Sequence, residues 1–299
     1  MLRVFSQPTL KSPALLCAFG GWADAASAAT SALRYLLLKR DGYRIAEFDP
    51  DAIYDYTTTR PITLLDGRGG RTLQWPELAW TAIEVAESPH DLIVLLGPEP
   101  DLRWRECVGT IGDFASRLGV CMVLTFGGFL AQVHYAGPPS LMGITADPRL
   151  KAELLQLGIG ESNYQGPTAF VTALSREAAS RDIPAASLWI AAPSYLSNTS
   201  NPKLAAALLR AAQHLLGQDL WLQELEAAGR DMDRRIEDAL RARPDLADFL
   251  GRLSGESEPR AEAAPQPEEQ EAELPSAEEV LRDLEDHLRR LKGNGAGDS

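Results

Sequence analysis

Three carboxylates and one guanidinium lie where this chain could do chemistry, because each follows an apolar run that predicts a strand. Asp24 comes shortly after the first such run, and Glu99 and Asp101 come directly after a later one. Arg103 follows close behind. Positioned carboxylates can act as general acid, general base or ribose-binding groups, and a guanidinium can pair with an anion. Since ligand crevices of open α/β sheets form beyond the carboxyl ends of the strands, these side chains are candidates for one shared cleft.

Small and aromatic residues complete the candidate cleft. Gly127 and Gly128 are expected to end a third strand, while Trp22 and Trp104 are expected to supply apolar walls. The candidate set is Gly21, Trp22, Asp24, Glu99, Asp101, Arg103, Gly127 and Gly128. Each member also has a purely structural interpretation. A carboxylate such as Asp24 can cap a helix or favour its positive end, glycine permits tight turns, and tryptophan fills a core.

Recognised catalytic and metal-binding motifs are absent from the sequence. The chain has no GxGxxG after a strand, no GxxxxGK[ST], no HExxH and no GxSxG. Its three cysteines and four histidines are scattered, which excludes a disulfide framework and a recognisable zinc or haem site. We therefore expect no metal and no cofactor, and the sequence favours a protein without catalytic activity.

Alternating strands and helices must position the candidate residues. The predicted strands are 14–19, 43–48, 92–96, 120–126 and 186–191, with a hairpin of 61–65 and 71–75. The predicted helices are 24–38, 76–86, 103–118, 168–181 and 202–216. This alternation predicts an α/β fold with a mainly parallel sheet covered by helices on both faces. The stretch 133–166 has no regular pattern and could be a lid, an edge hairpin or an oligomer contact.

The composition changes along the chain and predicts a series of regions. Residues 1–218 are expected to form the α/β domain, and 219–253 keep helical periodicity, which predicts a helical C-terminal extension packed on that domain. Residues 254–275 are dominated by Glu, Pro, Ala and Gln, which cannot bury enough apolar area to fold. This region predicts a disordered acidic linker. An amphipathic helix is expected over 276–292 and a disordered tail over 293–299.

The segment 276–292 has the pattern of a partner-binding helix. It opens on Ser276-Ala277-Glu278-Glu279, which is a capping-box pattern. Its apolar stripe consists of Leu281, Leu284, Leu288 and Leu291. A helix this short is marginal alone, so we expect it to fold on docking to its own domain, another subunit or a different protein.

Net charge and hydropathy limit the partners and the location. The formal net charge of −13 argues against nonspecific nucleic-acid binding, because phosphates would meet a repulsive field. No stretch approaches the roughly 20 apolar residues that span a bilayer, so no membrane partner is expected. The apolar run 14–19 is too short for the core of a signal peptide, and the charged Asp24 interrupts the small residues after it. We expect a cytoplasmic protein.

Four motifs occur in order over about residues 1–250. They are Gly21-Trp22-Ala23-Asp24 before an alanine-rich helix, Gly97-Pro98-Glu99-Pro100-Asp101 with Arg103-Trp104, Tyr164-Gln165-Gly166-Pro167-Thr168, and Asn201-Pro202-Lys203. Together they resemble the prokaryotic branch of the proteasome assembly chaperone two family. The resemblance implies a fold similar to nucleoside phosphorylases and homo-oligomeric assembly. It also implies a role in proteasome maturation or the assembly of other protein complexes, with no established enzymatic activity.

The chain departs from that family pattern at two places. Family members often carry His-Thr-Arg-Pro where this chain has His134-Tyr135-Ala136-Gly137-Pro138, so no role resting on that threonine or arginine is expected here. Chaperones that dock on the proteasome core can end in a hydrophobic residue, a tyrosine and any residue, whereas this sequence ends in Gly297-Asp298-Ser299. We therefore do not expect this terminus to insert into proteasome pockets.

The sequence supports more than one function. The first hypothesis is a non-catalytic assembly chaperone or scaffold, with proteasome subunits or another protein client as partner and with itself as a homo-oligomer. The second is an enzyme or ligand sensor that binds a nucleoside or a phosphorylated small molecule in the cleft. A third is that the segment 276–292 completes an oligomer by reaching a neighbouring subunit. We favour the first.

Overall fold

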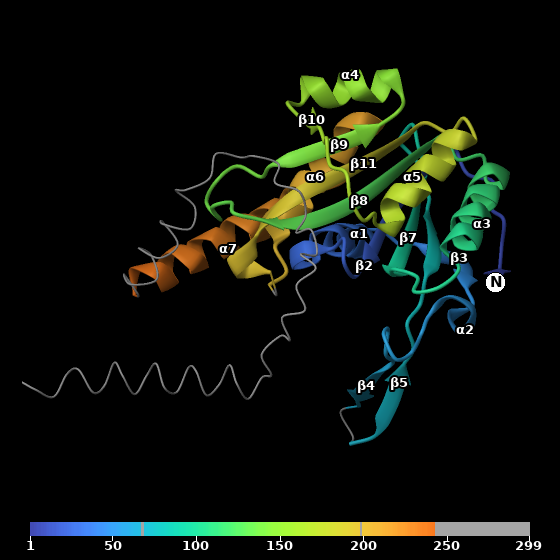
Figure 1. Ribbon diagram of the computed structural model, residues 1–299, viewed down its shortest axis with the longest axis horizontal. Helices are drawn as coiled ribbons and strands as arrows, with labels where there is room; N and C mark the ends of the chain where they lie inside the picture. Colours follow the sequence, from blue (N-terminus) through green and yellow to red (C-terminus); the bar gives the residue numbers. More distant parts are fainter. Residues whose placement is uncertain (67–68, 198, 243–299) are drawn as a thin grey trace, which may run out of the picture. The chain divides into compact units, whose positions relative to one another are not determined.

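The computed structural model describes residues 1–66, 69–197 and 199–242 (Figure 1). The chain divides into two compact units, Met1–Ala264 and Pro265–Ser299, and every described residue belongs to the first unit. The predicted linker, the predicted partner-binding helix with its four leucines and the predicted tail lie outside the described residues.

Nine strands among the described residues form one sheet in the order β1-β3-β6-β7-β2-β8-β11-β9-β10. Their bounds are Leu2–Val4 (β1), Ala14–Gly20 (β2), Tyr43–Phe48 (β3), Ala79–Ile83 (β6), Leu92–Pro98 (β7), Met122–Ala131 (β8), Leu141–Thr145 (β9), Gly160–Glu161 (β10) and Ala185–Pro193 (β11). The central strands β7, β2, β8 and β11 run parallel, whereas β6 and β9 pair antiparallel with the outer two of them. The predicted parallel sheet is confirmed at its centre, and antiparallel strands flank it.

Helices cover both faces of this sheet, as predicted (Figure 1). Their bounds are Ala28–Lys39 (α1), Pro50–Ile53 (α2), Trp104–Arg117 (α3), Pro148–Gln156 (α4), Phe170–Ser180 (α5), Pro202–Leu216 (α6) and Gln223–Arg241 (α7), with 3-10 turns at Ala25–Ser27 (η1) and Ser194–Leu196 (η2). Successive side chains of a strand point to opposite faces, so Leu16 joins a core with α1 and α6, while Leu15 joins a core with α3 and α5. No helix in the described ranges is both long and apolar enough to cross a bilayer.

The predicted helix over 76–86 is wrong, because this segment contains strand β6. Leu78, Trp80 and Ala82 are buried in one core, and this spacing of two residues is that of a strand. The segment lies between β3 and β7, which satisfy its backbone groups on both sides. A strand is therefore favoured here over the helix that local composition suggested.

The stretch 133–166, which has no regular sequence pattern, contributes edge strands and a helix. Strand β9 pairs antiparallel with β11, and β10 pairs with β9. Asp147 begins α4 by accepting hydrogen bonds from the amides of Arg149 and Leu150 at 2.8 and 3.0 Å. This stretch thus extends the sheet beyond its parallel centre.

The sequence led us to expect that Gly127 and Gly128 end a strand. This expectation is wrong, because both residues lie inside β8. An added Cβ on Gly127 would come within 2.7 Å of the Trp189 indole. On Gly128 it would come within 3.1 Å of the Ala25 carbonyl oxygen. These glycines allow a ring and a turn to approach the strand closely.

Helix α7 forms the described part of the predicted C-terminal extension and packs along α6. Gly229 permits a close approach of the two helices, because a Cβ there would lie 3.0 Å from the Lys203 Cα. The Lys203 ammonium lies 2.9 Å from the Asp233 carboxylate across the same contact. The extension is therefore attached to the domain by both packing and an ion pair.

The predicted hairpin is confirmed as strands β4 (Ile62–Leu65) and β5 (Arg71–Gln74), which form a separate two-stranded sheet. In Figure 1 this hairpin extends away from the nine-stranded sheet. Every residue of both strands is exposed. We refer to residues 62–74 as the arm.

Candidate functional site

The turns after β2 and β7 meet strand β8 at the carboxyl edge of the parallel strands. The Glu99 amide donates to the Gly20 carbonyl oxygen at 2.8 Å and thereby joins the first two turns. The Gly128 amide donates to the Ala23 carbonyl oxygen at 2.7 Å, and Asp24 pairs with Gly128 in a parallel bridge. The structure thus brings the turn that carries Asp24 beside the turn that carries Glu99 and beside Gly128 of β8.

The Asp24 carboxylate caps the start of helix α1. Its Oδ1 accepts hydrogen bonds from the amides of Ala29 and Thr30 at 2.9 and 3.1 Å, and its Oδ2 accepts one from the Thr30 hydroxyl at 2.5 Å. Burial raises the pKa of this carboxyl, and the three hydrogen bonds oppose that rise. The carboxylate occupies the place where a helix N-terminus would bind an anion.

The Glu99 carboxylate occupies a second helix N-terminus. Its Oε1 accepts a hydrogen bond at 2.6 Å from the amide of Phe170, the first residue of α5. Burial raises the pKa of Glu99 as well, against the lowering effect of that bond. Trp104 packs edge-on against the Phe170 ring with centroids 5.4 Å apart, so it belongs to the core around this cap.

Asp101 and Arg103 are used elsewhere in the fold. The Asp101 carboxylate accepts a hydrogen bond at 2.9 Å from the Asp55 amide. Arg103 is exposed and lies 3.8 Å from the Glu106 carboxylate on α3. Each of the three candidate carboxylates therefore accepts a hydrogen bond from a backbone amide, and these bonds stabilise the fold.

The raised pKa of Asp24 leads to a pH prediction. A carboxyl whose pKa is higher in the folded chain than in the unfolded chain binds more protons when folded, so its stabilising contribution is present below the unfolded pKa. That contribution is lost as pH rises toward the folded pKa. Replacing Asp24 with Asn keeps an oxygen acceptor for the helix amides and removes the titration. We expect Asp24→Asn to flatten the fall in stability with pH just above the ordinary Asp range, measured by urea unfolding between pH 3 and 7.

Asp55 provides a control of opposite sign. Hydrogen bonds from Thr57 lower the pKa of Asp55, so its contribution is present above the unfolded pKa and is lost as pH falls. Asp55→Asn should therefore change the pH dependence in the other direction. Equal pH profiles for wild type and Asp24→Asn would contradict the assignment of Asp24 as a buried cap.

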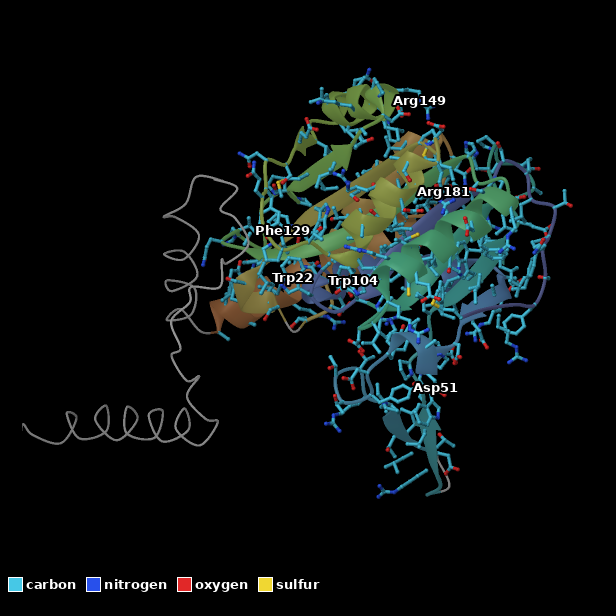
Figure 2. The ribbon with its side chains drawn as sticks, turned by 45° about the vertical axis from the view of Figure 1, so that its right-hand side comes forward. Trp22, Asp51, Trp104, Phe129, Arg149 and Arg181 are labelled. Carbon is cyan, nitrogen blue, oxygen red and sulfur yellow. The ribbon has the colours of Figure 1, made fainter. Side chains whose placement is uncertain are left out.

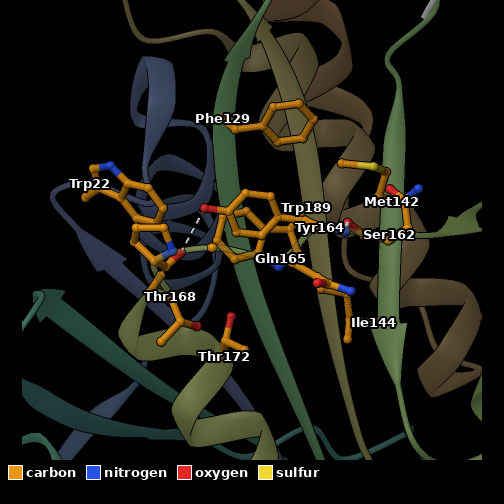
Figure 3. A pocket seen from close by; sticks show the side chains of 14 residues that line it. Trp22, Phe129, Met142, Ile144, Ser162, Tyr164, Gln165, Thr168, Thr172 and Trp189 are labelled. Carbon is orange, nitrogen blue, oxygen red and sulfur yellow. Dashed lines mark hydrogen bonds between the residues drawn. The ribbon is translucent and has the colours of Figure 1, made fainter. Parts of the chain in front are cut away.

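A pocket of about 350 Å³ lies beside these turns, over strands β8, β11 and β9 (Figure 3). Its apolar lining is Trp22, Phe129, Met142, Ile144, Tyr164 and Trp189. Its polar side chains are Ser162, Asn163, Gln165, Thr168 and Thr172. Figure 2 shows Trp22 and Phe129 at this edge of the sheet. Of the cleft residues expected from sequence, Trp22 lines the pocket, while the carboxylates and Arg103 do not.

The sequence signals for this pocket were present but were not connected with a site. The segment 164–168 was one of the motifs that carried the family resemblance, and it forms one pocket wall. Phe129 directly follows the glycine pair of β8. Trp189 comes from a predicted strand, whose apolar pattern could not separate pocket lining from core. Met142 and Ile144 lie in the stretch 133–166, which has no regular sequence pattern.

The pocket offers hydrogen-bonding and apolar groups but no lining residue with a formal charge. The Trp189 Nε1 is buried and has no hydrogen-bond partner in the described part of the chain. In that same part, no three or more His, Cys, Asp or Glu side chains are grouped so that they could hold a metal ion. The lining can therefore offer a ligand hydrogen bonds and apolar contacts.

The sequence model of the PAC2 family matches residues 18–240, which is more than half of the chain. The chain belongs to the PAC2 family. The family resemblance of the motifs is thus confirmed, and the matched range contains the capped turns, the pocket and the arm of this PAC2 protein. No curated protein matches the sequence.

Solved structures agree with this assignment. A PAC2 family protein from Streptomyces avermitilis is 34% identical, with a TM-score of 0.69 over 76% of this chain and 95% of that one. A proteasome-assembly chaperone homologue from Mycobacterium tuberculosis is 30% identical, with a TM-score of 0.71 over 79% of this chain and 99% of that one. The archaeal proteasome activator PbaB from Pyrococcus furiosus is 16% identical, with a TM-score of 0.63 over 80% and 98%, and shares the fold.

Proposed function

We propose that this PAC2 protein is a non-catalytic scaffold in the assembly of a protein complex, and that the arm contacts its protein client. The M. tuberculosis relative described as a proteasome-assembly chaperone homologue supports an assembly role. Proteasome subunits are the first candidates for the client, and another defined assembly is the second. The observation that carries the proposal is the apolar surface of the arm.

The arm exposes apolar side chains on both of its faces. Opposite residues of an antiparallel pair point to the same face, and the register sets Thr63 opposite Leu73 and Leu65 opposite Arg71. Leu65 and Leu73 therefore share one face, where they are 70% and 60% exposed. Ile62 and Leu64 are exposed on the other face.

A free arm of this kind favours a protein partner. A two-stranded hairpin is marginally stable in water without a surface to pack on. Exposed apolar patches on a folded domain are typical of protein contacts. A client that covers both faces would bury these leucines and stabilise the hairpin at once.

The proposal is tested by affinity capture from the native host with the tagged full chain. We expect the double substitution Leu65→Asp and Leu73→Asp to lower the yield of a defined multi-subunit client at least about tenfold, because burying two carboxylates in an apolar contact is costly. Leu38→Asp with Leu155→Asp is the matched control, since both leucines are exposed on helices of the domain. An unchanged client yield with the arm variant, at an unchanged melting temperature, would refute the role of the arm.

Self-association and the segment 276–292 belong to the same proposal. We expect a homo-oligomer, and removal of residues 276–299 should change its subunit number in native mass measurements if that segment reaches a neighbour. An unchanged subunit number would leave client binding or docking on its own domain as the role of its leucine stripe.

The second hypothesis, an enzyme or sensor for a nucleoside or a phosphorylated small molecule, receives less support from the geometry. Helix N-termini are the usual phosphate sites at this edge of an α/β sheet. Those of α1 and α5 are filled by Asp24 and Glu99. A phosphate there would have to displace a carboxylate of the chain itself.

A further inference from the structure

We propose that the pocket beside Trp22 binds an uncharged aromatic small molecule. This inference is separate from the proposed scaffold function, because the pocket and the arm share no residue. It rests on the charge and the ring content of the pocket lining, and on how the backbone fixes the pocket walls.

The absence of charge in the lining selects a neutral ligand. None of the residues that line the pocket has a formal charge, and the nearby carboxylates of Asp24 and Glu99 are held by helix amides. A charged ligand would lose its hydration without gaining an opposite charge. A neutral ligand loses far less.

Four rings from separate parts of the chain select an aromatic ligand. Trp22 comes from the turn after β2, Phe129 from β8, Tyr164 from the loop after β10, and Trp189 from β11 (Figure 3). Aromatic rings gain energy from edge-on and offset contacts with other rings beyond the area they bury. A volume of about 350 Å³ is at the lower end of the range for small-molecule sites, so a one- or two-ring compound fits.

One feature of the lining is unfavourable without a ligand. Trp22 is 57% exposed, although tryptophan is among the side chains that gain most from burial. A ligand ring in the pocket would cover part of the Trp22 ring.

The backbone fixes the walls before any ligand arrives. Gly127 lets the Trp189 ring lie directly on β8, as the 2.7 Å approach of an added Cβ shows. The Tyr164 hydroxyl donates to the Pro167 carbonyl oxygen at 3.0 Å, the bond drawn in Figure 3, and closes the loop over Gly166. A preformed site loses less conformational entropy on binding.

The test uses four matched naphthalene compounds and the full chain, with ligand-detected NMR and calorimetric titration. Wild type should bind neutral 2-naphthamide saturably, and 2-naphthoate and 2-naphthylmethylammonium at least about tenfold more weakly. Plain naphthalene, the fourth compound, should also bind, because ring contacts do not need a polar group on the ligand. Thr172→Phe should fill the pocket and abolish binding of all four compounds.

The controls keep the result interpretable. Trp22→Ala removes an exposed side chain and should weaken binding without unfolding the protein, whereas Trp75→Ala, at an exposed tryptophan next to the arm, should not. The arm variant should bind 2-naphthamide normally, which separates this inference from the proposed function. No saturable binding of 2-naphthamide, equal binding of its ions, or binding retained by a folded Thr172→Phe variant would overturn the proposal. Binding that appears only after removal of residues 276–299 would also overturn the proposal, because it would mean that the segment 276–292 is the occupant of the pocket.

Discussion

Replacing Gly97 with alanine is expected to lower the free energy of unfolding by about 3 kcal/mol, the upper end of the usual cost of an extra methyl group in a packed interior. The added Cβ would lie 2.1 Å from the Glu77 carbonyl oxygen and 2.8 Å from the Leu78 Cα. Both atoms are backbone, and the Leu78 carbonyl oxygen already accepts from the Phe48 amide, so neither can move without opening the sheet. A fall in Tm of roughly 6 to 12 °C would accompany this loss.

Gly109→Ala is the matched control for Gly97→Ala. Gly109 lies inside α3, and an added Cβ there meets no atom within 4 Å. Because alanine favours a helix over glycine, this change should leave stability unchanged or raise it by up to about 1 kcal/mol. Chemical unfolding monitored by circular dichroism measures both variants. Equal stabilities of the two would mean that the Glu77–Leu78 backbone does not lie against Gly97 as described.

Phe170→Ala is expected to cost about 3–5 kcal/mol, the usual range for truncating a buried phenylalanine. The Phe170 ring is fully buried, with the Phe19 ring centroid at 4.9 Å and that of Trp104 at 5.4 Å, both edge-on. Truncation would leave a cavity under the start of α5, where the Glu99 carboxylate is bound. We therefore also expect weaker binding of 2-naphthamide, since Thr172 on the same helix lines the pocket.

Phe5→Ala controls for the loss of an aromatic side chain as such. Phe5 is exposed, so its truncation should change the free energy of unfolding by no more than about 0.5 kcal/mol. Urea unfolding monitored by intrinsic fluorescence compares the two. A loss for Phe170→Ala as small as that for Phe5→Ala would contradict the described core between α3, α5 and β2.

Elements with a local signal could be predicted from the amino-acid sequence. The apolar runs of β2 and β7 predicted buried parallel strands, because both faces of such strands are covered. The predicted helix over 202–216 is confirmed as α6, and the structure shows the Asn201 side chain accepting from the Lys203 amide at 3.0 Å. The arm was predicted from two short runs around a turn signal. The motif order was sufficient to predict the family.

The roles of the residues at the sheet edge depend on the tertiary structure. In the sequence, Asp24 and Glu99 were compatible with capping and also with catalysis, and their bonds to α1 and α5 depend on how distant segments meet. The Gly127-Gly128 pair belongs inside β8 because Trp189 and Ala25 approach it from elsewhere in the chain. The pocket likewise arises from turns and strands that are far apart in sequence. The periodicity of a segment indicates which side of a helix or strand is buried. It does not indicate which distant side chain packs against that side. The site at the sheet edge is formed by such contacts between distant segments, so only the tertiary structure could reveal it.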